Sequence, residues 1–385
     1  MFISSSDFSH RDGLRVNRPL FIGGNMDFWS IDPIWNKDAH FSFVYGMRGN
    51  GKTYGTILKF LEEYFETGRG FGYVRRYRDD LKGVNGARSL FDAHVDNGEI
   101  ERLSKGKYNS VQYVSGAYYL ATVKEDSITR AFEPFCWAFC VATAEHYKGN
   151  PWSNCYALIF DEFISTDGYL LDEPKRFLNL VSTVKRQKEI FRVFLLGNTI
   201  NKYNPYFQAF GLSRAKDQEQ GTIDFYYNES NGRKIAVEYC SPIKLSESNE
   251  SFFAWDDPKL DMILNGTWET DEYGHCPIKF HRDDILFQYY IIFDEDILQC
   301  EIVQKDDSYF TYIHRRTYKL QDEKKELVFK QDYNSEYYIR RNLFRPIDDI
   351  GKKIKWFFDA EKVFYQDNEV GEMVKNYKEW CSKQK

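Results

Sequence analysis

An eight-residue stretch of this chain carries the residue types that bind phosphate at a turn from a strand to a helix. Residues 46–53 read GMRGNGKT and match the phosphate-loop pattern G-x-x-x-x-G-K-[ST] at every fixed position. Glycines let backbone N–H groups turn toward phosphate oxygens, and a following helix points its positive end at the same anion. The pattern predicts a nucleotide-binding loop made of Gly46, Met47, Arg48, Gly49, Asn50, Gly51, Lys52, Thr53 and Tyr54.

The residues on either side of this loop predict the elements that must hold it. Residues 41–45 form a short apolar run typical of a buried strand, and apolar residues recur every fourth position over 57–65, as in a helix that ends at Gly68. An ordinary helix capped by a glycine-rich turn is the simpler alternative. The order of strand, loop and helix instead favours a site where Lys52 reaches the β and γ phosphates of ATP and Thr53 holds Mg²⁺.

A second acidic motif follows later in the chain. Residues 156–160 are a continuous apolar run, as in a parallel strand buried on both faces, and Asp161 and Glu162 come directly after it. This is a Walker B pattern, in which Asp161 binds Mg²⁺ through water and Glu162 orients or deprotonates the attacking water. An exposed acidic turn after a core strand is the alternative, but the partnership with Lys52 favours the catalytic interpretation.

A third strand, over residues 191–197, leads to Asn198, which we interpret as a sensor beside the γ phosphate. Asn is also common in turns that end strands, so a purely local role is the competing interpretation. This strand and the strand over residues 156–160 fit the same mainly parallel sheet.

Several cations could complete such a site across a subunit boundary, because ring ATPases often use a neighbour's cation to neutralise charge in the transition state. Arg186 projects from a helix expected to open at Pro174 and is our first candidate, with Lys148 as the second. Any of these cations could equally be a solvated surface charge. The competitors are Arg48, Arg192 and Arg214.

Composition limits the class of protein. The chain has 385 residues, of which 42% are hydrophobic and 18% aromatic, enough to fill the cores of two domains. No apolar run approaches the roughly eighteen residues of a membrane span, and the amino terminus lacks a cationic start and a long apolar centre, so we expect an intracellular protein without a membrane partner. The seven cysteines are scattered without a C-x-x-C pair, which argues against disulfides and zinc.

The net charge of −6 (52 minus 58) is not that of a protein that coats nucleic acid, so any DNA contact must use local clusters. Solvated cationic faces are the alternative for each cluster. The candidates are 75–78, 314–316 with Lys319, and Lys105 with Lys107.

The chain divides into two parts. Strands and helices alternate over 40–211, followed by a predicted hairpin of 222–227 and 234–239. Apolar periodicity weakens over 241–271, which we interpret as a linker with a short helix around Trp255 to Ile263. The remainder predicts a three-stranded meander and two helices, over 285–293, 297–304, 309–318, 350–358 and 370–380.

These segments together resemble a known family. The loop GMRGNGKT, the basic strand FGYVRRYRDDL, the segment EHYKGN, the strand ALIFDEF and the later LLGN are similar to the DNA-packaging (encapsidation) ATPases of phi-29-like small tailed phages. The motifs lie in roughly the first 240 residues, so the carboxy-terminal third is covered only by architecture.

The resemblance implies an α/β protein with an N-terminal P-loop ASCE ATPase domain (1–240), a linker (241–271) and a smaller α+β domain of RNase H-like, vestigial-nuclease type (272–385). It implies a motor that hydrolyses ATP with Mg²⁺ and translocates double-stranded viral DNA into a prohead. It also implies a homo-oligomeric ring, a pentamer in this family, located in the host cytoplasm and transiently at the portal vertex. The implied partners are the portal or connector and, where the phage has one, a packaging RNA. Arg186 and Lys148 are carried over as trans-acting cations by position alone.

Two alternatives stay open. Asp294, Glu295 and Asp296 follow an apolar strand, where they could be metal ligands of a working nuclease in a large terminase, or simply a hairpin tip. The second alternative is a nucleotide-gated assembly protein that does not hydrolyse ATP. Glu162 disfavours it, because a carboxylate stands where a catalytic base belongs.

Overall fold

The computed structural model describes residues 29–81, 89–125, 127–165, 168–228, 232–242, 266–269, 271–276, 278–294, 296–306, 308–316, 326–330 and 342–383. Within these ranges, ten strands form one large sheet. They are β1 (Phe41–Gly46), β2 (Gly70–Arg75), β3 (Ser110–Val114), β4 (Ala117–Lys124), β5 (Ser127–Arg130), β6 (Cys136–Cys140), β7 (Cys155–Asp161), β8 (Arg192–Asn198), β9 (Thr222–Asn228) and β10 (Arg233–Tyr239).

The centre of the large sheet is parallel, as the sequence predicts. Its order is β3-β4-β6-β2-β7-β8-β1-β10-β9, and the strands from β6 to β10 in this order run parallel. Antiparallel strands flank this centre, with β3, β4 and β5 at one end and β9 at the other. All six residues of β1 are buried, because helices cover both of its faces.

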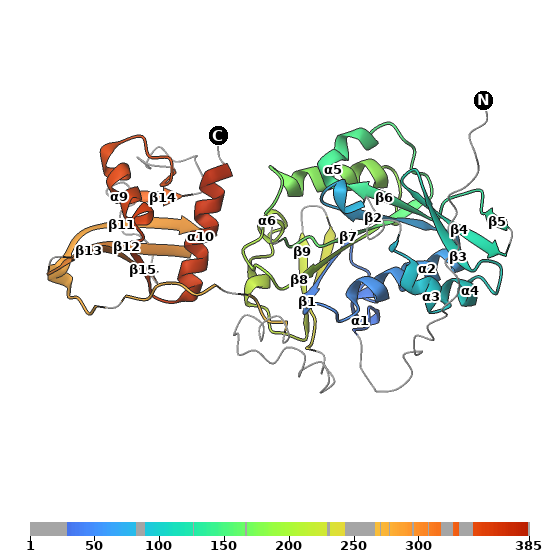
Figure 1. Ribbon diagram of the computed structural model, residues 1–385, viewed down its shortest axis with the longest axis horizontal. Coiled ribbons are helices and arrows are strands. Elements are labelled where there is room, and N and C mark those ends of the chain that lie inside the picture. Colours follow the sequence, from blue (N-terminus) through green and yellow to red (C-terminus); the bar gives the residue numbers. More distant parts are fainter. Residues whose placement is uncertain are drawn as a thin grey trace, which may run out of the picture.

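Side chains of β1 alternate between two separate cores. Phe43 and Tyr45 pack into the core beneath α5 and α6, whereas Val44 packs into the core beneath α2. Figure 1 shows these helices on the two faces of the sheet. The helices of this part are α1 (Asp32–Trp35), α2 (Lys52–Thr67), α3 (Asp92–Asp96), α4 (Glu99–Leu103), α5 (Glu173–Lys185) and α6 (Pro205–Ala209), with 3-10 turns η1 (Asp79–Leu81), η3 (Val141–Tyr147) and η4 (Ser213–Asp217).

A second, smaller sheet follows in the chain, and its meander is as predicted. Strand β11 pairs antiparallel with β12, and β12 with β13, while β14 and β15 add parallel strands at the two edges. The elements are η6 (Arg282–Asp284), β11 (Ile285–Phe293), β12 (Asp296–Lys305), β13 (Ser308–Arg315), β14 (Val328–Lys330), α9 (Asp349–Asp359), β15 (Val363–Tyr365) and α10 (Asn368–Lys383).

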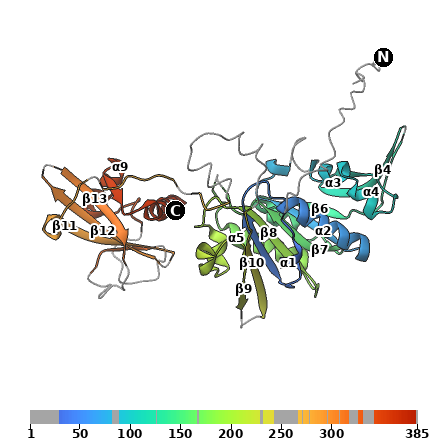
Figure 2. The same ribbon diagram turned by 90° about the horizontal axis from the view of Figure 1, so that it is seen from below.

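Helix α10 lies between the two sheets (Figures 1 and 2). Residues that follow β8 reach across to it: Asn201 donates to Asn376 at 2.9 Å and Lys202 pairs with Glu369. Tyr203 goes further and packs inside the core of the smaller sheet. The segment directly after the predicted sensor strand therefore holds the two parts together.

The linker predicted over 241–271 lies mostly outside the described residues, as do the short helix around Trp255 to Ile263, Lys319 and Glu295. The part that is described is packed: the Trp268 ring lies 5.0 Å from the Tyr45 ring, against the core of the large sheet.

Two compositional expectations can be compared with the structure. No helix in the described ranges combines the length and the apolar character needed to cross a membrane. All seven cysteines are free thiols, and all except Cys276 are buried.

Candidate nucleotide-binding site

The loop between β1 and α2 has the backbone conformation that a phosphate-binding loop needs. Gly51 caps α2 with a φ of 89°, in the left-handed region that favours glycine. At Gly46 the constraint is space, because an added Cβ would lie 2.8 Å from the Cβ of Cys240. The first N–H groups of α2 therefore open toward the same side as the loop.

The ammonium of Lys52 lies inside this loop. It donates to the carbonyl oxygens of Met47 at 2.7 Å and Gly46 at 3.3 Å. It also donates to the side-chain oxygens of Asn50 at 3.0 Å and Asn198 at 3.4 Å. Burial lowers the pKa of Lys52 to about 8. A phosphate would replace some of these neutral acceptors with a charged one.

Thr53 and Asp161 meet beside the loop although they are far apart in sequence. The Thr53 hydroxyl donates to Asp161 Oδ1 at 3.1 Å, and the Tyr73 hydroxyl donates to Asp161 Oδ2 at 2.8 Å. Burial raises the pKa of Asp161, and the nearby Arg75 opposes this shift. A hydroxyl next to a single carboxylate suits Mg²⁺, which takes few protein ligands and completes its shell with phosphates and water. These two side chains fit that ion.

Glu162 lies at the mouth of the site. It has a φ of 60°, and its side chain is 55% exposed. Arg75, at the end of the neighbouring strand β2, holds its carboxylate at 2.6 Å and also lies 3.6 Å from Asp161. Arg75 belongs to the cluster 75–78, a candidate DNA contact or solvated cationic face by its sequence, and in the structure it pairs with both acidic motif residues.

Arg76 belongs to the same candidate cluster, yet it is neither solvated nor at the surface. It is buried and paired with Glu173 at 2.9 Å, and it donates to the backbone of Glu162 at 3.0 Å. The signal that could have found both arginines is their place at the end of β2, since parallel strands bring their carboxyl ends to one edge.

A pocket of about 520 Å³ opens over this edge of the sheet. Most of the residues predicted to bind nucleotide line it, while Gly46 and Met47 contribute the carbonyls that hold Lys52. Its lining comprises Arg48, Gly49, Asn50, Gly51, Lys52, Thr53, Tyr54, Arg76, Tyr77, Asp80, Asp161, Glu162, Ile164, Ser165, Gly197, Asn198 and Ile200.

The predicted trans-acting cations lie outside this pocket. Arg186 is exposed at the end of α5 and lines a separate cavity with His40 and Arg233, near the amino ends of the strands. Lys148 is exposed and pairs with Glu145. Neither cation therefore contacts the nucleotide pocket of its own chain.

The other cations named as candidates have different neighbours. Arg192 pairs with Asp38 at 3.1 Å, and Arg214 lies over the Tyr226 ring at 5.1 Å. Arg48, in contrast, lines the nucleotide pocket itself.

Two of the three acidic residues predicted after β11, Asp294 and Asp296, are described by the structure. Asp294 directly follows β11 and has a φ of 49°, and Asp296 begins β12 and pairs with Lys216 at 3.0 Å. Glu295 lies outside the described residues. Among those that are described, no group of three His, Cys, Asp or Glu side chains could hold a metal ion. Asp294 and Asp296 therefore lie at facing ends of two antiparallel strands, and both lie within 4 Å of Lys216 of the large domain.

Comparison with known proteins now bears on this site. The sequence profile of the podovirus DNA encapsidation protein family (Gp16) matches residues 26–220, which span half of the chain. This region contains the phosphate loop and the acidic motif of Asp161 and Glu162. The chain belongs to this family.

Curated relatives share the matched region. The DNA packaging proteins of Bacillus phages phi29 and PZA are each 29% identical over 188 residues, covering 48% of this chain and 50% of theirs. That of Bacillus phage B103 is 30% identical over 178 residues, covering 46% and 49%. The chain thus spans about half the length of the curated relatives it matches.

Solved structures extend the likeness of fold to almost the whole chain. The Phi-28 gp11 DNA packaging motor matches with a TM-score of 0.54 and 18% identity, covering 94% of this chain and 99% of that one. The bacteriophage Phi-29 packaging motor assembly matches with a TM-score of 0.55 and 19% identity, covering 92% and 99%. The likeness of fold to these two structures therefore extends over both sheets of this chain.

Proposed function

We propose that this protein is a motor ATPase that hydrolyses ATP to move double-stranded viral DNA into a preformed prohead. The observation that carries the proposal is the meeting of Lys52, Thr53 and Asp161 at one pocket, in a member of the DNA encapsidation family. The relatives named as DNA packaging proteins match over the region that contains this pocket.

Each residue has a role that its position supports. Lys52 binds the β and γ phosphates, and Thr53 and Asp161 hold Mg²⁺, which neutralises phosphate charge when it is bound. Glu162 orients or deprotonates the attacking water. Asn198 lies 3.4 Å from the Lys52 ammonium, where its amide could contact the γ phosphate.

The motor acts as a homo-oligomeric ring, a pentamer by analogy with the family. Arg186 and Lys148 serve a neighbouring subunit's site, which agrees with their exposure and their absence from their own pocket. The ring works in the host cytoplasm at the portal vertex of the prohead, contacting the portal or connector and, where present, a packaging RNA.

We assign residues 1–240 to an ASCE ATPase domain, 241–271 to a linker, and 272–385 to an RNase H-like domain that has lost its nuclease. The ion pairs of Asp294 and Asp296 with Lys216, at 3.7 and 3.0 Å, support the last assignment, because a lysine occupies the place next to both carboxylates. This domain docks nucleic acid or the portal instead of cutting DNA.

Steady-state ATP hydrolysis by the wild type and by Glu162→Gln, each with and without double-stranded DNA at low salt, tests the proposal. We expect turnover that rises with DNA in the wild type and falls at least about a hundredfold in the variant, while ADP affinity stays the same. Equal turnover in both proteins would show that a residue other than Glu162 is the catalytic base. Wild-type turnover that does not change when DNA is added would argue against a packaging motor.

Mixing experiments test the trans-acting cation. Subunits carrying Arg186→Ala should regain activity when mixed with subunits carrying Lys52→Ala, because each supplies what the other lacks. Arg192→Ala is the control, since Arg192 pairs with Asp38 in its own chain. Absence of rescue at every mixing ratio would count against Arg186.

A further inference from the structure

A buried ion pair stands between the nucleotide pocket and the cleft that separates the two domains. Arg76 follows β2 and is 5% exposed, and Glu173 begins α5 and is fully buried. The Nε of Arg76 lies 2.9 Å from both carboxylate oxygens of Glu173. Burying two charges costs solvation free energy, so a buried ion pair contributes little net stability. We therefore expect this pair to have another role.

The remaining guanidinium nitrogens of Arg76 hold the backbone that carries the Walker B glutamate. Nη1 donates to the carbonyl oxygen of Glu162 at 3.0 Å, and Nη2 donates to that of Phe163 at 2.8 Å. On the other side, the Phe163 N–H donates to the carbonyl of Leu196 at 3.1 Å. The peptide after β7 is thus fixed from two directions.

This fixation matters because Glu162 has a left-handed backbone, with a φ of 60°. Such a conformation is uncommon for a residue with a side chain, and it persists only where the surroundings impose it. It sets the direction in which the Glu162 carboxylate leaves the backbone. A relaxed peptide would turn that carboxylate away from its present path.

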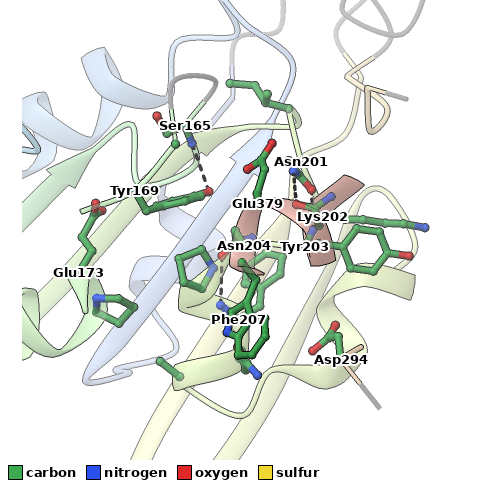
Figure 3. A pocket seen from close by; sticks show the side chains of 18 of the residues that line it. Ser165, Tyr169, Glu173, Asn201, Lys202, Tyr203, Asn204, Phe207, Asp294 and Glu379 are labelled. Carbon is green, nitrogen blue, oxygen red and sulfur yellow. Dashed lines mark hydrogen bonds between the residues drawn. The ribbon is translucent and has the colours of Figure 1, made fainter. Parts of the chain in front are cut away.

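Glu173 is itself anchored to the elements around the cleft. It accepts hydrogen bonds from the Leu170 N–H and the Tyr206 hydroxyl, each at 2.8 Å. Figure 3 shows Glu173 and Tyr169 along the wall of this cleft, a cavity of about 680 Å³. The Arg76 guanidinium lies 5.1 Å from the Tyr169 ring. Arg76 lines the nucleotide pocket and Glu173 lines the cleft, so their ion pair lies between the two cavities.

We propose that Arg76 and Glu173 are positioning residues for hydrolysis, acting through the backbone of Glu162. The inference rests on the proposed ATPase function. All three guanidinium nitrogens of Arg76 donate to protein oxygens, and two of these oxygens belong to the peptide groups of Glu162 and Phe163, so the role we assign to Arg76 is to hold this backbone. Loss of the pair should reduce turnover while leaving nucleotide binding by Lys52 and Thr53 intact.

Two variants and a matched control test this inference in the full-length chain. Arg76→Lys keeps the charge but lacks the planar fork that reaches Glu173 and both carbonyls together, and Glu173→Gln removes the anchor's charge. Glu301→Gln is the control: this buried carboxylate of the smaller sheet accepts hydrogen bonds from Gln288 at 3.0 Å and Gln299 at 2.7 Å.

We expect kcat to fall at least about tenfold in Arg76→Lys and Glu173→Gln, with ATP KM and ADP Kd within about twofold of the wild type. Glu301→Gln should lose thermal stability and keep its kcat. Unchanged kcat in folded Arg76→Lys would overturn the inference, as would a parallel loss of kcat and nucleotide affinity. A wild type that never hydrolyses ATP would instead refute the proposed function.

A milder change covers the case in which these variants do not fold. Tyr206→Phe removes one hydrogen bond to Glu173 and should lower kcat by roughly two- to fivefold. Hydrogen exchange gives a readout independent of activity: amides of residues 162–165 should exchange faster in Tyr206→Phe and Arg76→Lys, while those of α2 stay protected. Unchanged exchange at 162–165 would overturn the proposal.

Discussion

At the scale of single residues, the Lys52 ammonium is the group that we propose binds phosphate, so its charge state matters most for nucleotide affinity. It is 6% exposed and held by neutral oxygens, and burial lowers its pKa from 10.5 to about 8. The free protein therefore loses half of this charge near pH 8, well below the range of an exposed lysine.

This shift predicts a pH dependence of nucleotide affinity. Bound phosphates favour the protonated lysine, so the ADP Kd should rise above about pH 8, by up to about tenfold per unit. Titration calorimetry from pH 7.5 to 9.5 at constant ionic strength measures it. Lys59→Gln, an α2 variant outside the pocket, should keep the same slope. A flat Kd over this range would contradict the lowered pKa.

The motif residues could be predicted because their spacing within short segments reflects the chemistry directly. Lys52, Asp161 and Asn198 all meet at the predicted pocket. Arg76 and Glu173 were not assigned to the site, because they are 97 residues apart and only the placement of β2 beside β7 brings them together. Short motifs do not encode strand order.

At the scale of the elements, β10 carries a buried carboxylate close to the phosphate loop. Glu238 is 8% exposed, its Oε1 accepts from the Trp29 indole N–H at 2.7 Å, and its Oε2 has no partner in the described part of the chain. Burial raises the pKa of Glu238 from 4.5 to about 7, and the Trp29 hydrogen bond opposes this.

The raised pKa gives a signed prediction for stability. Because the folded protein binds this proton more tightly than the unfolded chain, Glu238 contributes a loss of stability as the pH rises from about 4.5 to about 7. Glu238→Gln removes that loss and should be more stable than the wild type at pH 8, by up to about 3 kcal/mol.

Urea unfolding at pH 5 and pH 8 measures this difference. Glu101→Gln, which changes an exposed carboxylate on α4, should behave as the wild type at both values. If the Glu238→Gln protein were less stable than the wild type at pH 8, burial would not be the dominant influence on this carboxylate.

Most elements were predictable from sequence because their apolar patterns are strong. The helix after the phosphate loop ends at Gly68, whose φ is 74°, and the meander strands agree with their apolar runs. The additions β14 and β15 were missed, because each has only three residues and joins the sheet through parallel pairing with distant strands. Local periodicity cannot signal such short strands.

At the scale of the whole molecule, Tyr203 ties the two domains together. It lies five residues beyond Asn198 yet packs in the core of the smaller sheet, with its ring 6.0 Å from that of Phe293. Ion pairs of Lys202 and Lys216 surround this contact. Partly exposed pairs contribute little, so the buried ring is the main link.

Removing that ring should weaken the smaller domain selectively. Tyr203→Ala loses buried aromatic packing, on the order of 3 kcal/mol, and calorimetry should show the smaller domain unfolding at lower temperature while the large domain changes little. Tyr227→Ala, at an exposed position of β9, is the control. Equal shifts of both transitions would show that Tyr203 supports the large domain instead.

The contact between Gly46 and Cys240 has a consequence for the evolutionary history of the loop. A Cβ at position 46 would lie 2.8 Å from the Cβ of Cys240, which directly follows β10. The Cys240 N–H donates to the carbonyl oxygen of Tyr45, so this Cβ is held by the backbone and cannot rotate away. A side chain at position 46 would require position 240 to be glycine. The first glycine of the motif is therefore constrained by a residue nearly two hundred positions later in the chain. We expect related proteins that lack glycine at one of these two positions to have glycine at the other.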